Sequence, residues 1–403
     1  MSVAEEAALK ATETAPAAGM RAPVALFALA AGIIITNSFA PQTLVGLMAA
    51  SAGVTTSMSG LIAMIPFLGY AAGLFFLVPL ADLVENRRLV LRMLTAATLS
   101  AVGVIFAPNA AVLLPLLFIL GAACSVIQVL VPIAAAMTEP EHRGRVIGDI
   151  MSGLMVGILL SRPAASLLAG SFGWKGFYVA SAAAMGLLTV TLAFRLIERH
   201  PVQNTTYRHL IASLWHLFAS EPVLRRRSIS AAIVMIAFNF FWTTIAYVLG
   251  SAPIHLGQTG IAAFALVGAG GALITPAVGR WSDKGLGKRV TAISHVVMMV
   301  GFGIAAVSGL TASLPIYVIL IGLGISALML DMGVLGEQTV GRYMINQLKP
   351  EARGRINGIF VGVFFIGGAI GSALSGMLWS IGGWGAICLG GAFLGLLAFT
   401  TRR

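Results

Sequence analysis

Long apolar stretches alternate with short polar ones along the chain from residue 22 onward. Each apolar stretch holds about 20 residues, which is enough for a helix to cross a hydrocarbon core of about 30 Å. The pattern therefore predicts an all-α membrane protein with twelve transmembrane helices. We expect these helices at about 22–48, 58–81, 88–107, 111–137, 145–170, 174–196, 228–251, 258–281, 289–309, 313–340, 354–379 and 383–400.

The polar stretches between the expected helices occur twice. PEHRGRVIG at 140–148 returns 210 residues later as PEARGRING at 350–358, and PLADLVENRR returns as GRWSDKGLGKR at a shift of 201 residues. A repeat of this length predicts two copies of one unit, here two six-helix bundles related by pseudo-two-fold symmetry. In a membrane protein such a pair is typical of a transporter whose binding site lies between the halves.

The repeat also sets the expected domain boundaries. We expect an N-terminal six-helix bundle at 22–196 and a C-terminal six-helix bundle at 228–403, with a disordered cytoplasmic tail at 1–21. The segment 197–227 joins the two bundles, and its apolar residues recur at helical spacing. This linker is predicted to form an amphipathic helix along the inner membrane surface.

Composition and charge agree with a membrane protein. With 58% hydrophobic residues, 10% charged residues and a mean hydropathy of +0.96, the chain has too few charges to cover a soluble globule. Of its 25 lysines and arginines, all but Arg162 and Lys175 fall on or near one side of the expected bundle. By the positive-inside rule that side is cytoplasmic, so both termini are expected in the cytoplasm. Because the net charge of +11 is spread over every inner loop, it predicts a lipid bilayer as the partner, with no nucleic acid.

Several other chemistries find no support in the sequence. Cys124 and Cys388 both lie inside expected helices, so neither a disulfide framework nor a metal cluster is indicated. The segment GLGKR lacks the first glycine and the final Ser or Thr of a phosphate loop, and the six histidines are scattered. We therefore expect a monomeric protein that is neither an enzyme nor an ATP-driven pump, with no cofactor and no metal.

Two charged residues lie deep in expected helices, Asp331 and Arg162. An ionised carboxylate near the bilayer centre costs ~3 kcal/mol on insertion scales, and such residues usually serve ion or substrate traffic. Asp331 is therefore a candidate for proton coupling or substrate contact, and the competing interpretation is a static pair with Arg342. Arg162 aligns with Ser372 in the repeat, and we expect it to bind an anionic substrate group or to act in a gate. A depth difference of roughly 12 Å opposes a direct pair between Asp331 and Arg162.

The repeat also aligns polar residues in the expected helices 1, 4, 7 and 10. Asn37 matches Asn239, and Gln128 falls near Asp331. These matched positions predict a pseudo-symmetric polar ring, and Trp242, three residues after Asn239, shares much of the face of Asn239. The competing interpretation for a lone Asn or Gln is a hydrogen bond to a neighbouring helix, worth around 1 kcal/mol. Glycines at a spacing of four residues predict close, sliding helix contacts, at Gly153 with Gly157 and at Gly367 with Gly371.

The six-plus-six arrangement and its loops resemble the major facilitator superfamily. The loop signature of that family is Gly, any residue, Leu, Ala, Asp, two variable residues, Gly and two basic residues, and the second copy follows it closely with Gly279 and Gly287. In the first copy Val78 and Glu85 replace the glycines. The resemblance implies that helices 1, 4, 7 and 10 line a central cavity, so that the polar ring would surround a substrate path. For the loops it implies a cytoplasmic gate, and the alternative is a plain topology determinant. We place in the gate Asp82, Arg87, Arg88, Asp283, Lys288 and Arg289, together with the repeated pair Arg143 and Arg353.

Shorter motifs, such as NFFWTT and LDMGVLG, are similar to those of the bacterial drug and metabolite efflux branch of that superfamily. This resemblance implies a secondary transporter of a bacterial inner membrane that works by alternating access. It would export a small amphipathic drug or metabolite in exchange for protons. Within transport, a facilitator or symporter for a sugar, nucleoside or organic anion stays open, with Arg162 as the anion contact. Outside transport, a membrane receptor or assembly protein stays open.

Overall fold

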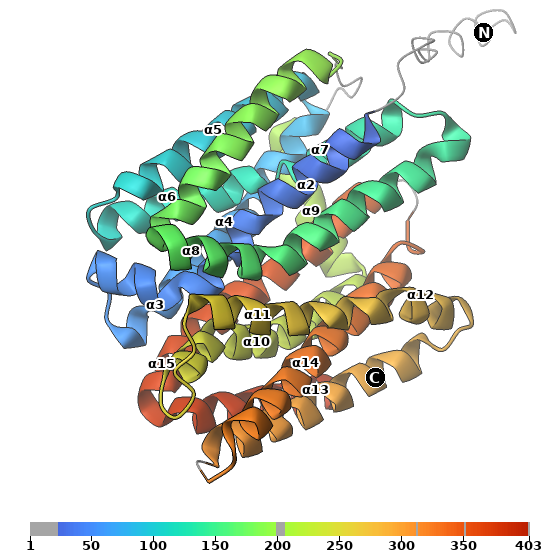
Figure 1. The fold of residues 1–403 in the computed structure, drawn as a ribbon. Coiled ribbons are helices and arrows are strands. Elements are labelled where there is room, and N and C mark those ends of the chain that lie inside the picture. Colours follow the sequence, from blue (N-terminus) through green and yellow to red (C-terminus); the bar gives the residue numbers. More distant parts are fainter. Residues whose placement is uncertain (1–22, 199–205, 312, 350–351, 402–403) are drawn as a thin grey trace, which may run out of the picture.

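A computed structural model describes residues 23–198, 206–311, 313–349 and 352–401 (Figure 1). Every regular element in these ranges is helical, and none is a strand, which confirms the all-helical prediction. The expected tail at 1–21 lies outside the described residues, as does part of the linker.

The first half of the fold, Val24–Arg195, forms the upper layer of Figure 1. Its α-helices are α2 (Val24–Phe39), α3 (Pro41–Ala52), α4 (Gly60–Ala72), α5 (Asn86–Phe106), α6 (Ala110–Cys124), α7 (Ile127–Ala136) and α8 (Arg143–Arg195). Short helical turns join them at η1 (Thr56–Met58), η2 (Gly73–Leu77), η3 (Val78–Asp82) and η4 (Pro140–His142).

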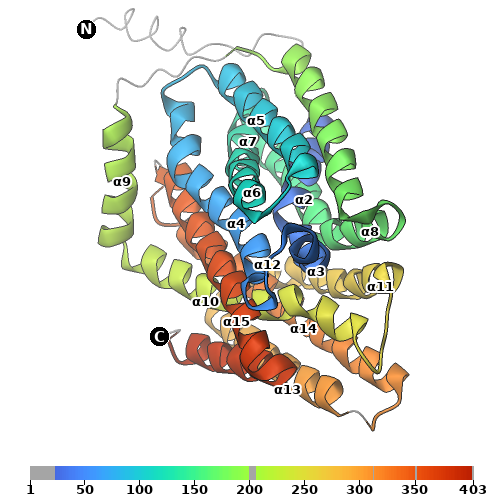
Figure 2. The same cartoon turned by 90° about the vertical axis from the view of Figure 1, so that its left-hand side faces the viewer.

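The second half, Pro222–Thr401, forms the lower layer of Figure 1. Its helices are α10 (Pro222–Gly250), α11 (Gln258–Ala269), η5 (Gly270–Ile274), α12 (Thr275–Asp283), α13 (Gly287–Leu310), α14 (Ile316–Ile345) and α15 (Arg353–Thr401). The linker helix α9 (Tyr207–Ser220) precedes them and stands at the edge of the molecule in Figure 2.

By length and composition, nine helical segments of the described chain can cross a membrane, or ten if the bent pair α2 and α3 is one span. Two of the nine are unusually long, namely α8 with 53 residues and α15 with 49. Each contains glycine with non-helical backbone angles, Gly173 in α8 and Gly382 with Gly383 in α15. A turn at each glycine would yield two spans, so the count of twelve stays a prediction.

Local sequence explains why several expected helices are bent. The α2 and α3 axes differ by 47° because Pro41, which lacks a backbone N–H, begins α3 directly after Ala40. The α5 helix begins where the carboxylate of Glu85 accepts hydrogen bonds from the backbone N–H groups of Arg87 and Arg88, at 2.6 and 2.8 Å. Glu85, which departs from the family loop signature, therefore caps the helix that follows the loop.

The paired glycines bring helices of the same half into close contact. A Cβ atom on Gly157 would lie 2.5 Å from the Cα of Gly32 on α2. At the equivalent place in the second half, a Cβ atom on Gly371 would lie 2.5 Å from the carbonyl oxygen of Ile236 on α10. The predicted close contacts are therefore present, but they lie within each half. They stiffen the halves, whereas we expected them to support sliding between moving parts.

We expect Gly371→Ala to destabilise the protein by about 1–3 kcal/mol. The added methyl group would overlap the backbone of α10, and that backbone can make room only if the whole helix shifts. Gly358→Ala on the same helix is the matched control, since a Cβ atom there meets nothing within 4 Å. Thermal unfolding of the purified variants measures the difference. Equal melting temperatures for the two variants would contradict the packing described here.

The helices run between two ends of the molecule. We call one the basic end, where the loops carry Arg87, Arg143 and Arg289, and the other the opposite end. At the opposite end the halves touch, since a Cβ atom on Gly46 of α3 would lie 3.2 Å from the Tyr247 ring of α10. The α4 and α15 helices also run side by side between the halves (Figures 1 and 2).

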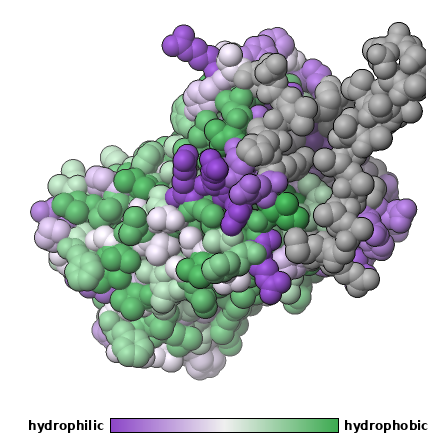
Figure 3. Space-filling model, turned by 90° about the horizontal axis from the view of Figure 1, so that it is seen from above, coloured by the Kyte–Doolittle hydropathy of each residue, from purple (hydrophilic) through white to green (hydrophobic). Residues whose placement is uncertain are grey.

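The outer surface between the ends is largely apolar. Figure 3 shows a face dominated by hydrophobic residues, with hydrophilic ones gathered in limited areas. Large apolar side chains point outward from both halves, including Phe194 and Leu273, each 84% exposed. In water such a surface would aggregate, and in a bilayer it contacts lipid chains.

Candidate functional site

Arg162 lies at the centre of the molecule, on α8, with only 1% of its surface exposed. Its Nε atom donates a hydrogen bond to the Gln42 side-chain oxygen on α3 at 2.8 Å. Its guanidinium carbon lies 4.1 Å from the centre of the Trp242 ring, 5.1 Å from that of Phe238 and 5.8 Å from that of Phe39. Three aromatic rings and one amide thus replace the water that a guanidinium group normally requires.

The amide of Gln42 extends this contact across the boundary between the halves. Its nitrogen donates a hydrogen bond to the side-chain oxygen of Asn239 on α10 at 2.7 Å. The Ser372 hydroxyl on α15 donates to the same oxygen at 3.0 Å. Arg162 and Ser372 are equivalent positions in the repeat, so both copies of this position contribute to one network. The network joins α3 and α8 of the first half to α10 and α15 of the second.

Asp331 on α14 contacts the edge of the Trp242 ring. The indole N–H of Trp242 donates a hydrogen bond to a carboxylate oxygen of Asp331 at 3.2 Å. A Cβ atom on Gly271 would lie 2.6 Å from the Cβ of Asp331, so glycine is needed at that position for the backbone to approach. Asp331 and Arg162, both described residues, form no ion pair, but both contact the Trp242 side chain. The alternative partner Arg342 makes no ion pair with Asp331 either.

The four residues of the expected polar ring are not brought together. Asn37 accepts a hydrogen bond from Ser181 at 2.8 Å and contacts Met185, both within the first half. Gln128 donates to the Tyr70 hydroxyl at 3.4 Å, and Tyr70 stacks on Phe365 of α15 with ring centres 4.3 Å apart. Asn239 and Asp331 alone remain in the central network.

Sequence reasoning did not find Gln42, although it occupies the centre of this network. The sequence does contain a sign of its importance, because the Gln42 amide directly follows Pro41 and interrupts an apolar stretch. Four polar atoms around the network are buried without a hydrogen-bond partner among the described residues. They are Arg162 Nη2, Ser166 Oγ, Thr243 Oγ1 and Ser38 Oγ. Buried polar groups are normally paired, so these atoms are suited to contact a ligand or water.

The first-copy gate residues make most of their contacts within the first half. Arg87 pairs with Glu198 at 3.2 Å and donates a hydrogen bond to the Ala193 carbonyl oxygen at 2.6 Å, both near the end of α8. Arg88 is bound by Glu85 at 3.7 Å and is largely exposed. Asp82 is exposed and interacts electrostatically with Arg355 of the second half.

The second-copy residues Asp283, Lys288 and Arg289 lie exposed between α12 and α13, and these three described residues form no ion pair. The repeated arginines have matching roles. Arg143 donates from Nε to the Thr138 carbonyl oxygen after α7 at 3.2 Å, and Arg353 donates to the Asn346 carbonyl oxygen after α14 at 3.1 Å. Each guanidinium therefore binds the negative end of the preceding helix.

Comparison with known proteins places the chain in a family. The Major Facilitator Superfamily model matches residues 25–336, so the chain belongs to this superfamily. It is 34% identical over 379 residues to the uncharacterized transporter YgaY of Escherichia coli O157:H7, which covers 93% of each protein. It is 29% identical over 378 residues to a transporter of Streptomyces coelicolor, covering 92% of this chain and 84% of that protein.

The fold agrees with this assignment. The xylose transporter XylE from E. coli superposes with a TM-score of 0.72 at 13% identity, covering 94% of this chain and 97% of that one. The protein is thus a multi-pass membrane transporter of the major facilitator type, a class that binds small-molecule substrates within a membrane.

Proposed function

We propose that the protein is a secondary transporter that exports a small amphipathic compound in exchange for protons, by alternating access. The observation that carries this proposal is the buried network of Arg162, Trp242 and Asp331 between the halves. Charged residues within a membrane are costly and usually serve transport. Here they lie between the two parts that must move relative to each other.

In this mechanism Asp331 alternates between substrate and proton. While it is charged, its carboxylate binds a donor or cationic group of the substrate, and the rings of Phe39, Phe238 and Trp242 hold the apolar part. A proton that arrives from the outside neutralises Asp331 and releases the substrate. Loss of that proton to the cytoplasm restores the site. The unpartnered Nη2 atom of Arg162 offers a further hydrogen bond to the substrate.

The proposal includes a topology. We take α8 and α15 to turn at Gly173 and at Gly382 with Gly383, so that each crosses the membrane twice. With the bent pair α2 and α3 counted as one span, the chain then crosses twelve times. The basic end faces the cytoplasm by the positive-inside rule. Contact between the halves at the opposite end then closes the outer side in this conformation.

A transport assay tests this function. Compounds that raise the melting temperature of the purified protein would be loaded into proteoliposomes, and their movement would be followed with and without an imposed pH gradient. We expect net transport that stops when the gradient is collapsed. Equal initial rates with and without a gradient would identify a facilitator, and the absence of any stabilising compound would favour a receptor or assembly protein.

Trp242 should influence substrate affinity through two separable contacts. Trp242→Phe keeps an aromatic face for Arg162 but removes the N–H donor to Asp331. A hydrogen bond to a charged group contributes about 1.5 kcal/mol or more, so we expect affinity to fall about tenfold. Trp242→Leu should lose more, because the aromatic face goes as well. Titration calorimetry measures both variants, and a Phe variant with unchanged affinity would contradict this role.

A further inference from the structure

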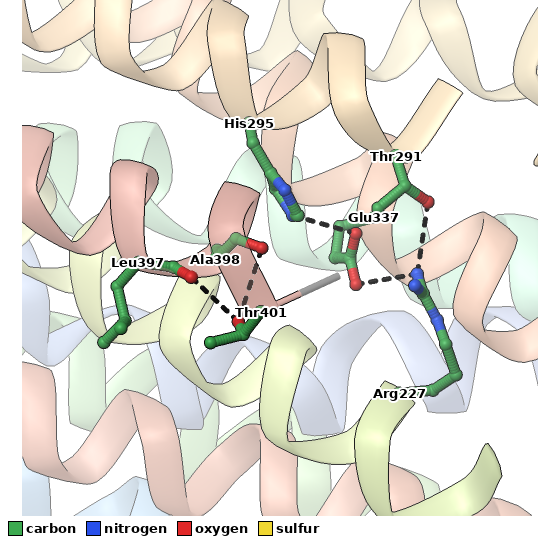
Figure 4. Close-up of polar contacts among 7 residues, drawn as sticks. All are labelled: Arg227, Thr291, His295, Glu337, Leu397, Ala398 and Thr401. Atoms are coloured by element: carbon green, nitrogen blue, oxygen red, sulfur yellow. Dashed lines mark hydrogen bonds and ion pairs between the residues drawn. The ribbon is translucent and has the colours of Figure 1, made fainter. Parts of the chain in front are cut away.

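A second buried charged cluster lies within the second half of the protein (Figure 4). Glu337 on α14 pairs through one oxygen with Arg227 of α10 at 2.8 Å. Its other oxygen contacts Nε2 of His295 on α13 at 3.1 Å. Arg227 also donates to the Thr291 hydroxyl at 3.2 Å. Glu337 and His295 are 0% exposed, so these contacts form without water.

The cluster is separate from the central network but involves the same helices. Glu337 follows Asp331 by six residues on α14, which places it about 9 Å nearer the basic end and turns it by about 120°. The α10 and α14 helices are thus joined twice. Trp242 binds Asp331 near the centre, and Arg227 binds Glu337 near the basic end.

The hydrogen bonds of the cluster leave one ring nitrogen of His295 without a partner among the described residues. A charged carboxylate only accepts, so the Nε2 atom of His295 must carry the hydrogen that Glu337 accepts. In the neutral ring, the Nδ1 atom then has a free lone pair, and it is buried with no partner among the described residues. Arg227 and Glu337 already balance each other in charge. An unpaired buried acceptor is costly, and a static cross-link would not require one.

Among the described residues, Glu337 is the one titratable group that forms a hydrogen bond or ion pair with His295. The α10 helix contributes Arg227 and α14 contributes Glu337, while α13 adds the neutral Thr291. The α15 helix approaches the His295 backbone with Gly395, and its nearby Thr401 donates to the carbonyl oxygens of Leu397 and Ala398 on its own helix.

We infer that His295 is a second proton-binding site, separate from Asp331, with Nδ1 as the atom that accepts the proton. The proton adds to the free lone pair, and the Nε2–H group continues to donate to Glu337. The cluster then contains two cations and one carboxylate. Because both cations share that carboxylate, the ion pair between Arg227 and Glu337 weakens. Protonation would thus loosen α10 from α14 at the basic end. Because Nδ1 is shielded from water here, it exchanges protons only when these helices move.

Nitrogen NMR tests this inference without any transported compound, so its result does not depend on the proposed efflux. The full chain, with ¹⁵N-labelled histidine, would be placed in lipid nanodiscs after replacing His142, His200, His209, His216 and His255 with Gln. His295 is then the only histidine, and the cluster itself is unchanged. From pH 8.5 to pH 5 we expect its two ring signals to change from the separated pair of the neutral Nε2–H form to the close pair of the imidazolium.

Proton counting provides a second measurement. Over the same pH range, His295→Gln in the otherwise natural chain should bind one proton fewer than the parent, and Asp331→Asn should not remove that difference. Gln retains a donor for Glu337 but cannot titrate. A ring that keeps the neutral signal pattern down to pH 5, or equal proton uptake by the parent and His295→Gln, would overturn the inference and leave the cluster as a structural cross-link.

Discussion

Replacing Arg162 with Gln is expected to abolish transport and to open the outer side of the protein. The Arg162 guanidinium binds Gln42, which in turn binds Asn239 of the second half, and it lies against Trp242, so it holds the two halves together at the centre. A hydrogen bond to a charged group contributes about 1.5–3 kcal/mol, and a desolvated cation–π contact about 2 kcal/mol. Losing them should shift the population of conformations at least tenfold towards the form open at the opposite end.

Cysteine labelling measures this shift. Ser59 is buried beside the contact between the halves, so Ser59→Cys reports opening when Cys124 and Cys388 are replaced by Ala. We expect labelling at least tenfold faster in Arg162→Gln. Arg162→Lys, which keeps the charge but not the planar group, should lie between that variant and the parent. Unchanged labelling together with unimpaired transport would show that Arg162 does not hold the halves together.

Replacing Asp331 with Asn is expected to lower substrate affinity at least tenfold. Asn keeps an oxygen that accepts the Trp242 hydrogen bond, but it imitates the neutral form in which the substrate is released. A tenfold loss corresponds to about 1.4 kcal/mol, which is modest for a buried charged contact. Binding titrations with a compound from the stabilisation screen give the value.

Asp149→Asn is the matched control for this substitution, because Asp149 is an exposed carboxylate on α8. It should bind substrate like the parent. If Asp331→Asn also binds like the parent, the substrate does not contact the carboxylate, and Asp331 acts elsewhere in the cycle or only in packing.

The hydrophobic pattern predicted the fold well because each helix must cover a bilayer with apolar residues. Single residues decide details that the pattern does not show. The expected span at 22–48 bends at Pro41, and the span Ala110–Ala136, expected at 111–137, has a short irregularity at Ser125. Glu85 was a departure from a loop signature in the sequence, and the structure shows that it begins α5.

The candidate site was predicted only in part. The repeat singled out Arg162 because its partner position holds Ser372, and both positions contribute to the same network. The cluster around Glu337 was missed, because its partners lie 42 and 110 residues away in the sequence, at His295 and Arg227. Hydrophobic spacing shows which residues share a helix face, but it does not show which faces of distant helices meet.

The most direct test of proton exchange at Asp331 is the release of protons when substrate binds. Adding a bound compound to weakly buffered purified protein near neutral pH should release protons from the parent, up to one per substrate. The same addition to Asp331→Asn, at a concentration that saturates the variant, should release none. Substrate binding without proton release in the parent, or equal release in both proteins, would contradict exchange of substrate for a proton at Asp331.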